Sequence, residues 1–400
     1  MNQLLITKQG RAIVSALHDD KNGIQQFHVV SADEQHIQIG DIFLGQVQNI
    51  VKNIQAAFVE IAPGINGYLS LEEARHAIYA NPKNSDKLCI GDKILVQVSR
   101  EPIKSKPVTL TTDFSLSGKF VVLMPYQSDI RLSSKITDKQ ERSRLQNIAS
   151  TVLSDYGYGC ILRTNAAGHT EEEITTALTR LVDQYQNICH KGIHSIRHTK
   201  LYSGVPVYLA DLRDSAEGEL TYIRTDEIDL YEEMKNFLEE NQPEDLDKLQ
   251  LYQEESLSMT ALYRIRTALD KALDERVWMK SGAYLVIQPT EALTVIDVNS
   301  GKAVKSKQSL EENMRSINRE AAELIAEQLR LRNISGMILI DFISMKSKEY
   351  QEELLSYLQE LLRKDPIKTV AIDITALGLV EVTRKRTSRP LLEYKHLIKE

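Results

Sequence analysis

Cysteine is scarce in this 400-residue sequence, and its three cysteines (Cys89, Cys160 and Cys189) form no CxxC pair. This scarcity argues against a disulfide framework and against a thiolate zinc site, and it favours a reducing cytoplasm. No apolar run approaches the roughly 18 residues that a membrane-spanning helix needs. The first residues also lack the basic and then apolar layout of a signal peptide. The sequence therefore predicts a cytoplasmic protein without a membrane segment.

An overall excess of basic residues is also lacking, because 56 Asp and Glu outnumber 49 Lys and Arg and give a net charge of −7. The acidic residues are not evenly spread. Residues 211–255 hold 16 acidic and 4 basic residues, a local charge of −12, so the remaining residues carry +5. One acidic segment hides a mildly basic remainder, and the global charge therefore does not exclude an anionic substrate.

The length of the chain predicts two to four domains. The sequence patterns differ from one region to the next. Residues 40–118 consist of short β-rich runs broken by Gly and Asn, which indicates a small barrel. Residues 171–189 place Ile174, Leu178 and Leu181 on one face of a helix. The chain is therefore expected to combine an all-β domain with mixed α and β regions.

The clearest pattern lies in the last third of the sequence. Apolar strands are predicted at 292–297 and 336–342, and the segment 309–333 between them repeats apolar residues at helical spacing. Strand, helix and strand form a βαβ unit, so the two strands should be parallel. One strand ends at Asp297 and the other reaches Asp341, which predicts two carboxylates at the same edge of one sheet.

Two interpretations of Asp297 are open from the pattern alone. Asn299, Ser300 and Gly301 follow it, and turns prefer these residues, so the strand would simply run into a turn. The other interpretation depends on Asp341, because α/β sheets place ligand sites at the carboxyl edge of their strands. Two close carboxylates repel each other, and Mg²⁺ binds through one or two carboxylates. Asn299 falls on the same face of the strand as Asp297 and could orient a ligand there. A bound ion would activate water, so this interpretation predicts metal-assisted hydrolysis.

Three segments carry these strand ends and the basic run that follows them: "EALTVIDVNSGK", "NREAAELIAEQLRLRNISGMILIDFISM" and "GLVEVTRKR". They are preceded, in order, by "GQVQNIVKNIQAAFVEIAPGINGYLSL", "VTLTTDFSLSGKFVVLMP" and "GCILRTNAAG". Together these segments closely resemble the catalytic region of the ribonuclease E/G family of bacterial endoribonucleases. The similarity runs through most of the chain.

The resemblance implies a multidomain α+β and α/β architecture. An RNase H-like fold is interrupted by an S1 barrel of the OB type and by a 5′-sensor segment, and a DNase I-like subdomain follows. The corresponding residues are 1–38 and 200–278 for the discontinuous RNase H-like subdomain, 39–118 for the S1 barrel, 119–199 for the 5′-sensor region and 279–400 for the DNase I-like catalytic subdomain.

The resemblance also implies roles for individual residues. Two aspartates and an asparagine of the family form a Mg²⁺ site, with Mn²⁺ as a substitute, and they fall on Asp297, Asp341 and Asn299. The matching RNA contacts of the barrel fall on Phe58, Tyr68 and Lys106, and the matching pocket for a 5′-monophosphate falls on Arg163 and Thr164. Composition alone favours a core position for the two barrel aromatics and an ordinary surface pair for Arg163 and Thr164.

Basic residues near the catalytic strands are further candidates for RNA contact. Lys302 stands in the loop after Asn299, together with Lys305 and Lys307, in place of an arginine-bearing loop of the family. Arg384 and Arg386 follow the last strand, and this position favours RNA over a plain solvated run.

The sequence departs from the family in two further ways. The CxxC that builds a zinc link between subunits is missing, as is the small C-terminal domain, so zinc is not expected and any oligomer should form without that link. Ala376 stands where the family usually has an arginine near the active site. One contact to RNA phosphate is therefore expected to be lost or supplied by neighbouring cations.

These expectations predict an endoribonuclease that cleaves single-stranded RNA, including rRNA precursors and mRNA, and leaves 5′-phosphate and 3′-hydroxyl ends. Two alternatives remain. A non-catalytic S1-type protein would bind RNA or ribosomes without turnover, against which the intact Asp297, Asn299 and Asp341 argue. A DNA nuclease would use the same site on a different substrate.

Overall fold

The computed structural model describes residues 2–33, 37–81, 87–102, 107–215, 220–301 and 310–399. The chain divides into two compact units, each built from segments that are far apart in the sequence. The first unit comprises Met1–Ala32, Leu220–Lys235 and Asp247–Glu400, and the second comprises Asp33–Glu219 and Asn236–Leu246. None of the described helices is both long and apolar enough to cross a membrane.

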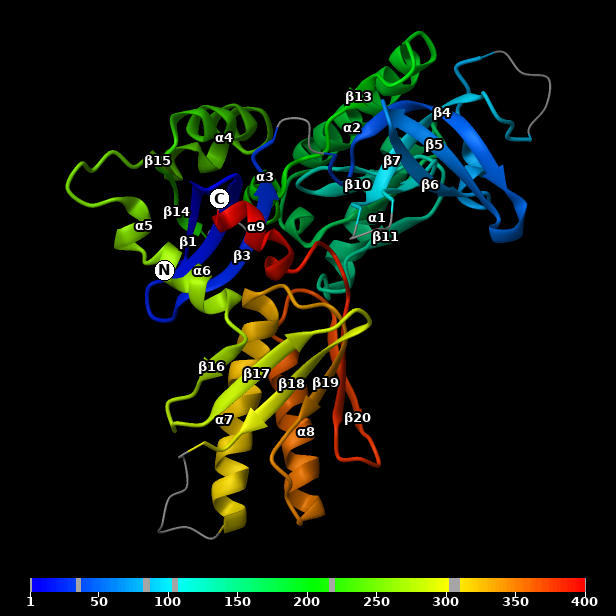
Figure 1. Cartoon of the computed structure of the whole chain (residues 1–400). Coiled ribbons are helices and arrows are strands. Elements are labelled where there is room, and N and C mark those ends of the chain that lie inside the picture. Colours follow the sequence, from blue (N-terminus) through cyan, green and yellow to red (C-terminus); the bar gives the residue numbers. More distant parts are fainter. Residues whose placement is uncertain are drawn as a thin grey trace. The chain divides into compact units, whose positions relative to one another are not determined.

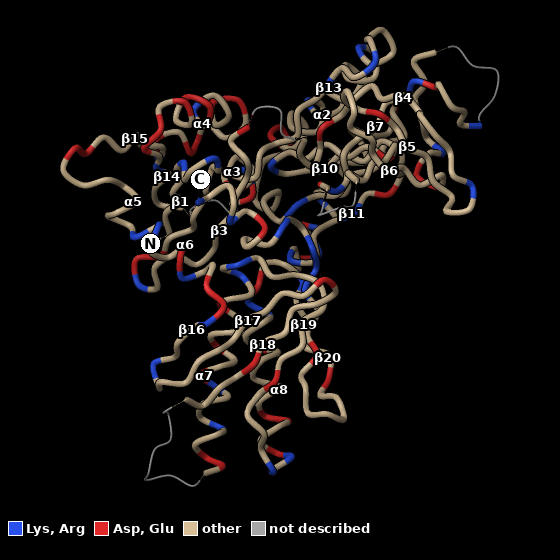
Figure 2. The backbone as a smooth tube through the Cα atoms, viewed as in Figure 1, with Lys and Arg blue, Asp and Glu red and all other residues tan. Residues whose placement is uncertain are grey.

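The first unit contains a five-stranded sheet in which the N-terminal strands pair with a strand from the middle of the chain. In spatial order the strands are β15 (Leu249–Leu251), β14 (Leu220–Thr225), β1 (Asn2–Gln9), β2 (Ala12–Asp19) and β3 (Gly23–Ser31). β1 is parallel to β14 and antiparallel to β2. Helices α5 (Met259–Leu262), α6 (Ile265–Leu273) and α9 (Lys395–Lys399) belong to this unit, whereas α4 (Ile228–Asn241) is divided between the two units. Figure 2 marks the acidic residues along α4, in the segment whose composition is strongly acidic.

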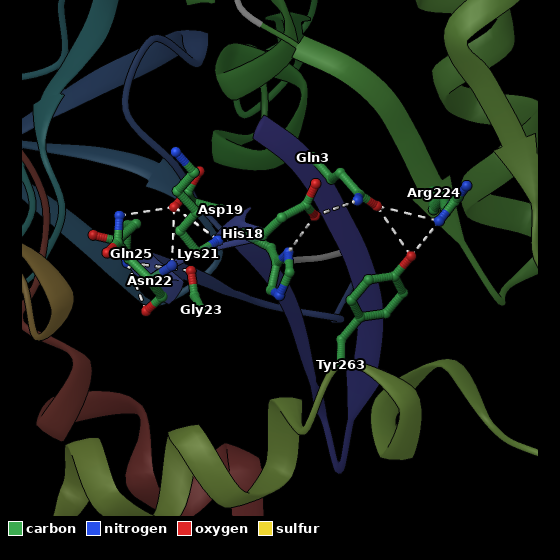
Figure 3. A network of polar contacts seen from close by, with 10 residues as sticks. Gln3, His18, Asp19, Lys21, Asn22, Gly23, Gln25, Arg224 and Tyr263 are labelled. Carbon is green, nitrogen blue, oxygen red and sulfur yellow. Dashed lines mark hydrogen bonds and ion pairs between the residues drawn. The ribbon is translucent and has the colours of Figure 1, made fainter. Parts of the chain in front are cut away.

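A polar network ties β1 to β14 and to the turn between α5 and α6 (Figure 3). The Oε1 atom of Gln3 accepts hydrogen bonds from Nη1 of Arg224 at 3.2 Å and from the hydroxyl of Tyr263 at 3.0 Å. The Nε2 atom of Gln3 donates to Asp20 at 3.0 Å. One amide side chain therefore links three segments of this sheet and its helices.

The second sheet of the first unit has six strands. In spatial order they are β16 (Arg276–Trp278), β17 (Tyr284–Pro289), β18 (Leu293–Asn299), β19 (Gly336–Asp341), β21 (Val380–Arg384) and β20 (Thr369–Ile374). β18 and β19 are parallel, and helix α7 (Leu310–Leu331) connects them. Helix α8 (Lys348–Leu362) precedes β20, and Figure 1 shows both helices on the same face of the sheet.

The two faces of this sheet differ because strand side chains alternate with a period of two. Ile296 and Val298 of β18 and Ile338 and Ile340 of β19 are buried in a core shared with the helices. The helices contribute the apolar residues Ile317, Ala321, Ile325, Leu329, Leu354 and Leu358. The opposite face of the same strands carries the partly exposed and exposed side chains, and the polar strand ends lie there.

The second unit contains a closed five-stranded barrel. Its strands are β4 (Ile42–Val51), β5 (Ala56–Ala62), β6 (Ile65–Ser70), β8 (Thr109–Thr111) and β7 (Lys93–Arg100), and β7 pairs back onto β4 to close it. β13 (Lys200–Tyr202) adds to the outer edge of β4. A Cβ at Gly67 would lie 2.4 Å from Cδ1 of Leu110, so only glycine permits this packing inside the barrel.

Besides the barrel, the described part of the second unit contains a four-stranded sheet and three complete helices, and the end of α4 also belongs to it. The strands, in spatial order, are β11 (Ile130–Leu132), β12 (Gly159–Leu162), β10 (Val121–Met124) and β9 (Leu116–Ser117). The helices are α1 (Lys139–Leu153), α2 (Glu171–Ile193) and α3 (Val207–Asp214). α2 begins with a capping box between Thr170 and Glu173, which satisfies two backbone N–H groups at its first turn.

The structure confirms the coarse fold prediction, a mixed α/β chain with a closed OB-like barrel between residues 42 and 111. It also confirms the predicted helix at 309–333, as α7, and the parallel pairing of the strands on either side of it. The RNase H-like and DNase I-like assignments, and the domain boundaries that the resemblance implies, stay predictions.

Candidate active site

Asp297 and Asp341 lie opposite each other on the parallel strands β18 and β19. Neighbouring strands in a sheet are about 4.8 Å apart, so the two residues are direct neighbours across the ladder. Both side chains are on the face away from α7 and α8, where Asp297 is partly exposed and Asp341 is exposed. The sheet therefore presents two adjacent carboxylates to solvent.

Asn299 supports this pair from two residues further along β18. Its Nδ2 atom donates a hydrogen bond of 2.5 Å to Oδ2 of Asp297. The backbone beyond it bends at Gly301, which has φ +54° and lies close to Gly282, since a Cβ there would be 2.6 Å from the Gly282 carbonyl oxygen. The strand and the turn are thus both present, and the amide contacts one of the two carboxylate oxygens of Asp297.

The donor set at this edge fits a hard divalent cation. Two carboxylates and one amide offer oxygen ligands, and Mg²⁺ commonly uses one or two carboxylates while it keeps several waters. Within the described ranges, no three or more His, Cys, Asp and Glu residues gather into a metal-binding group. Asp297 and Asp341 are the residues that could hold such an ion here, and water would have to complete its coordination.

Asn318 of α7 positions the loop that follows Asp341. Asn318 is fully buried, and its side chain both donates to the Ile343 carbonyl at 2.8 Å and accepts from the Ile343 N–H at 3.0 Å. Glu311 of the same helix accepts from the backbone N–H of Ser347 at 2.7 Å. Sequence reasoning missed Asn318, although a polar amide on the apolar stripe of a helix is a signal that could have found it.

The basic run at the end of β21 is not brought to the carboxylate edge. In the antiparallel pairing of β19 and β21, Arg384 lies opposite Gly336 and Val380 lies opposite Ile340. With about 3.4 Å per strand residue, Arg384 is roughly 17 Å along the sheet from Asp341. The exposed turn that contains Ala376 lies instead at the Asp341 end, where the family arginine was expected.

Contact with RNA would require an exposed side chain, but that of Arg384 is buried. The residue is only 2% exposed, and its guanidinium donates to Asp365 and to Asn333, both at 2.8 Å. This arginine is therefore engaged in holding β21 to neighbouring segments. Lys385 and Arg386 are the exposed cations of the run.

Phe58 and Tyr68 are cross-strand partners on β5 and β6 of the barrel. Their ring centroids are 6.2 Å apart at 78°, an edge-to-face arrangement. Both are partly exposed, whereas the barrel core is formed by alternating neighbours such as Val59 and Leu69. The two rings therefore lie outside the core. Lys106 is outside the described residues, as are Lys302, Lys305 and Lys307 of the loop after Asn299.

Arg163 and Thr164 follow β12 in the second unit. Nη1 of Arg163 donates to Asp214 at 2.6 Å, and the Thr164 hydroxyl shares a hydrogen bond of 2.9 Å with Ser133. Burial alone would raise the pKa of Asp214, but hydrogen bonds from Arg163 and Arg213 hold that pKa below its usual value. Asp214 is therefore a carboxylate at neutral pH, and a phosphate at this position would compete with it for Arg163.

Comparison with known proteins bears on this geometry. Residues 115–387 match the model of the "Ribonuclease E/G family". Ribonuclease G of Haemophilus influenzae is 34% identical over 92% of this chain and 76% of its own length, and ribonuclease G of Escherichia coli K12 is 32% identical over 91% and 76%. Ribonuclease E of Nostoc sp. is 36% identical over 98% of this chain and 56% of its own length. The chain thus spans three quarters of these ribonucleases G and little more than half of this ribonuclease E.

Proposed function

The chain belongs to the ribonuclease E/G family and is an endoribonuclease, and from this we propose that it hydrolyses single-stranded RNA with Mg²⁺ as its cofactor. Cleavage would leave 5′-phosphate and 3′-hydroxyl ends. Precursors of rRNA and mRNA in the cytoplasm are the proposed substrates. The observation that carries the proposal is the register pairing of Asp297 with Asp341 on the open face of the sheet.

Each residue of this group has a distinct proposed part. Asp297 and Asp341 would hold the cation, and their mutual repulsion favours a site that is completed by positive charge. When bound, Mg²⁺ supplies activation of water and offsets negative charge on the phosphoryl oxygens. Asn299 keeps Asp297 in one orientation through its 2.5 Å hydrogen bond, so the carboxylate is held before the substrate arrives.

Other residues would make further contacts with the RNA. Phe58 and Tyr68 present partly exposed rings on the barrel, and stacking of a base on such a ring contributes about 1–3 kcal/mol. Arg386 is the exposed cation proposed for phosphate contact beyond the last strand. Lys106 is proposed for RNA contact because it matches such a position of the family, and Lys302 because it stands in the loop after Asn299. Arg163 and Thr164 are proposed to sense a 5′-monophosphate.

The test is cleavage of a short 5′-labelled single-stranded RNA by the wild-type chain and by Asp341→Asn. With Mg²⁺ present, we expect the substitution to reduce the rate by at least about a hundredfold, since it removes charge stabilisation at the reacting phosphate. Glu360→Gln, on an exposed glutamate of helix α8, which packs on the opposite face of the same sheet, is the matched control and should cleave as the wild type does. Mass spectrometry of the products assigns their end groups.

The same assay separates the remaining candidates. If the wild-type chain and Asp341→Asn retain equal activity with Mg²⁺, the proposed site is wrong. If neither cleaves but both bind the RNA, the chain acts as an RNA-binding protein. A DNA oligomer of the same sequence should remain intact, and its cleavage would contradict the proposed substrate. Replacement of Mg²⁺ by Mn²⁺ should retain cleavage.

A further inference from the structure

Trp278 is the single tryptophan of the chain, and it lies on the edge strand β16 with 62% of its surface exposed. Its ring centroid is 5.0 Å from that of Tyr284, with the rings tilted by 53°. The guanidinium of Arg276 lies 5.8 Å from the Trp278 ring and 4.6 Å from the Tyr284 ring. Two aromatic rings with a guanidinium beside them form a surface on which a planar group can stack.

The strand register connects this cluster to the candidate active site. One row across the sheet runs from Arg276 through Val286 to Asp297. The next row runs from Trp278 through Tyr284 to Asn299, so it ends at the residue that orients Asp297. Directly opposed residues share a face of the sheet, and two strand spacings amount to roughly 10 Å. The indole and the candidate site are thus neighbours on one surface.

A groove of about 740 Å³ adjoins this surface. It is lined by Lys271, Asp274, Glu275, Arg276, Val277, Trp278 and Val286. The two basic and two acidic side chains of this lining give no net charge, so charge alone does not indicate which ligand the groove would bind. The distinctive wall is the exposed indole, with a guanidinium beside it, which is a suitable surface for stacking the face of a nucleobase.

We propose that Trp278 is a base-binding residue: its indole stacks on a nucleotide of the single-stranded RNA close to the phosphate that would meet the cation at Asp297 and Asp341. Arg276 contacts the backbone of the same nucleotide. This inference rests on the proposed function, because only that function places an RNA strand at the adjacent site. The occupant is RNA rather than a protein segment because the cluster shares its sheet face and its register rows with that site.

The single tryptophan makes the first test direct. In EDTA, without divalent cations, a short single-stranded RNA is titrated into the full wild-type chain while tryptophan fluorescence is recorded. Stacking of a base on the indole should quench the signal with saturable dependence on RNA. An independent binding assay gives the Kd. Saturable binding without a change in the fluorescence would overturn the inference.

The second test uses cleavage by Trp278→Ala and Trp278→Phe. We expect the alanine variant to raise KM about ten- to a hundredfold, while the phenylalanine variant retains most of the binding because it keeps an aromatic face. Tyr156→Ala, which removes another exposed aromatic ring in the second unit, is the matched control and should leave KM unchanged. Thermal melting verifies that each variant is folded.

Abasic substrates separate base stacking from a structural effect. RNA oligomers that lack one base at successive positions around the cleaved bond are compared for the wild-type chain and Trp278→Ala. At one position the missing base should abolish the difference in KM between the wild-type chain and Trp278→Ala, as in a double-mutant cycle. An identical penalty of Trp278→Ala on every oligomer would contradict base binding and indicate a structural role.

The outcomes also distinguish this inference from the proposed function. Quenching of Trp278 by RNA without any cleavage would remove the endonuclease mechanism and leave RNA binding at this face. Normal cleavage with neither quenching nor a KM effect would leave the mechanism intact and overturn the inference. A change of oligomeric state in Trp278→Ala, with unchanged RNA binding, would indicate that a second copy of the chain covers this face.

Discussion

Arg384 and Asp365 form an ion pair in which each side chain is only 1% exposed, with 2.8 Å between Nε and Oδ2. A second acceptor, Oδ1 of Asn333, lies 2.8 Å from the same guanidinium. Buried ion pairs of this kind tolerate the loss of one partner poorly, because the remaining charge keeps its desolvation cost without compensation. This pair connects β21 to the segment that precedes β20, at the end of the sheet remote from Asp341.

We therefore predict opposite phenotypes for two neighbouring arginines. Arg384→Ala should lower the free energy of unfolding by about 3–5 kcal/mol, since Asp365 would remain buried and unpaired. Arg386→Ala should change stability by less than about 0.5 kcal/mol but reduce the salt dependence of RNA binding by about one phosphate contact. Urea unfolding measures the stability of each variant, and RNA binding at several salt concentrations measures the salt dependence. A stable Arg384→Ala variant with weakened RNA binding would reverse this assignment.

Asn318→Leu should lower both stability and activity. The substitution leaves the Ile343 N–H and carbonyl without their partner, at a cost of roughly 1–3 kcal/mol for a buried polar group. The loop after Asp341 would lose its anchor to α7, and we expect cleavage to fall by about 10- to 100-fold, the usual effect of losing a supporting hydrogen bond at a metal site. Asn318→Asp would keep the acceptor but bury an unpaired carboxylate against the Ile343 carbonyl, so it should destabilise the chain at least as much. Equal activity of Asn318→Leu and the wild type would contradict this role.

Thermal melting should detect the cation without any RNA. A ligand that binds only the folded state at a hundredfold excess over Kd stabilises it by about 2.7 kcal/mol, so Mg²⁺ should raise the Tm of the wild-type chain. The double variant Asp297→Asn with Asp341→Asn should show no such rise. In EDTA this variant should be at least as stable as the wild type, because the repulsion between two carboxylates is gone. An equal Mg²⁺ response in both proteins would place the ion elsewhere.

The pH dependence of stability should report on Glu141 in the second unit. A hydrogen bond from Arg144, and a further one from the Gly168 N–H, lower the pKa of Glu141 from 4.5 to about 2. A folded-state pKa below the unfolded value means that the stabilisation is complete above about pH 4.5 and is lost as the pH falls toward 2.

Glu141→Gln should therefore destabilise the chain at pH 6 by about 1 kcal/mol, a small value because the pair is partly exposed and screened. The difference between Glu141→Gln and the wild type should shrink steadily between pH 4.5 and 2. Urea unfolding at a series of pH values measures it. Glu172→Gln, on an exposed glutamate of α2, provides the control. A difference that grows as the pH falls would contradict the assigned direction.

The parts of the site that could be predicted are those carried by local pattern. Continuous apolar runs before Asp297 and Asp341, with a helical repeat between them, are sufficient to predict parallel strands that share an edge. The register that pairs the two aspartates directly is a further step, because it depends on packing against α7 and α8. The barrel could be predicted for the same reason, since its short strands alternate and are punctuated by glycine.

The parts that could not be predicted depend on partners distant in sequence. A basic run gives no indication that Arg384 turns inward, because its partner Asp365 belongs to a separate segment. The order of β21 and β20 in the sheet is likewise tertiary, and it moves Arg386 away from the carboxylate edge while it brings Ala376 near. The sequence also gives no indication that Trp278 is exposed, because tryptophan is normally a largely buried residue.

The pairing of β1 with β14 has a consequence for synthesis of the chain. With growth of about 5–20 residues per second, the roughly 200 residues between these strands take on the order of 10–40 s to emerge. During that interval β1 has no neighbour on one side, and an unpaired edge is a template for pairing with other chains. Leu4, Leu5 and Ile6, which the finished sheet buries, lie on the strand whose edge stays open until β14 has been made.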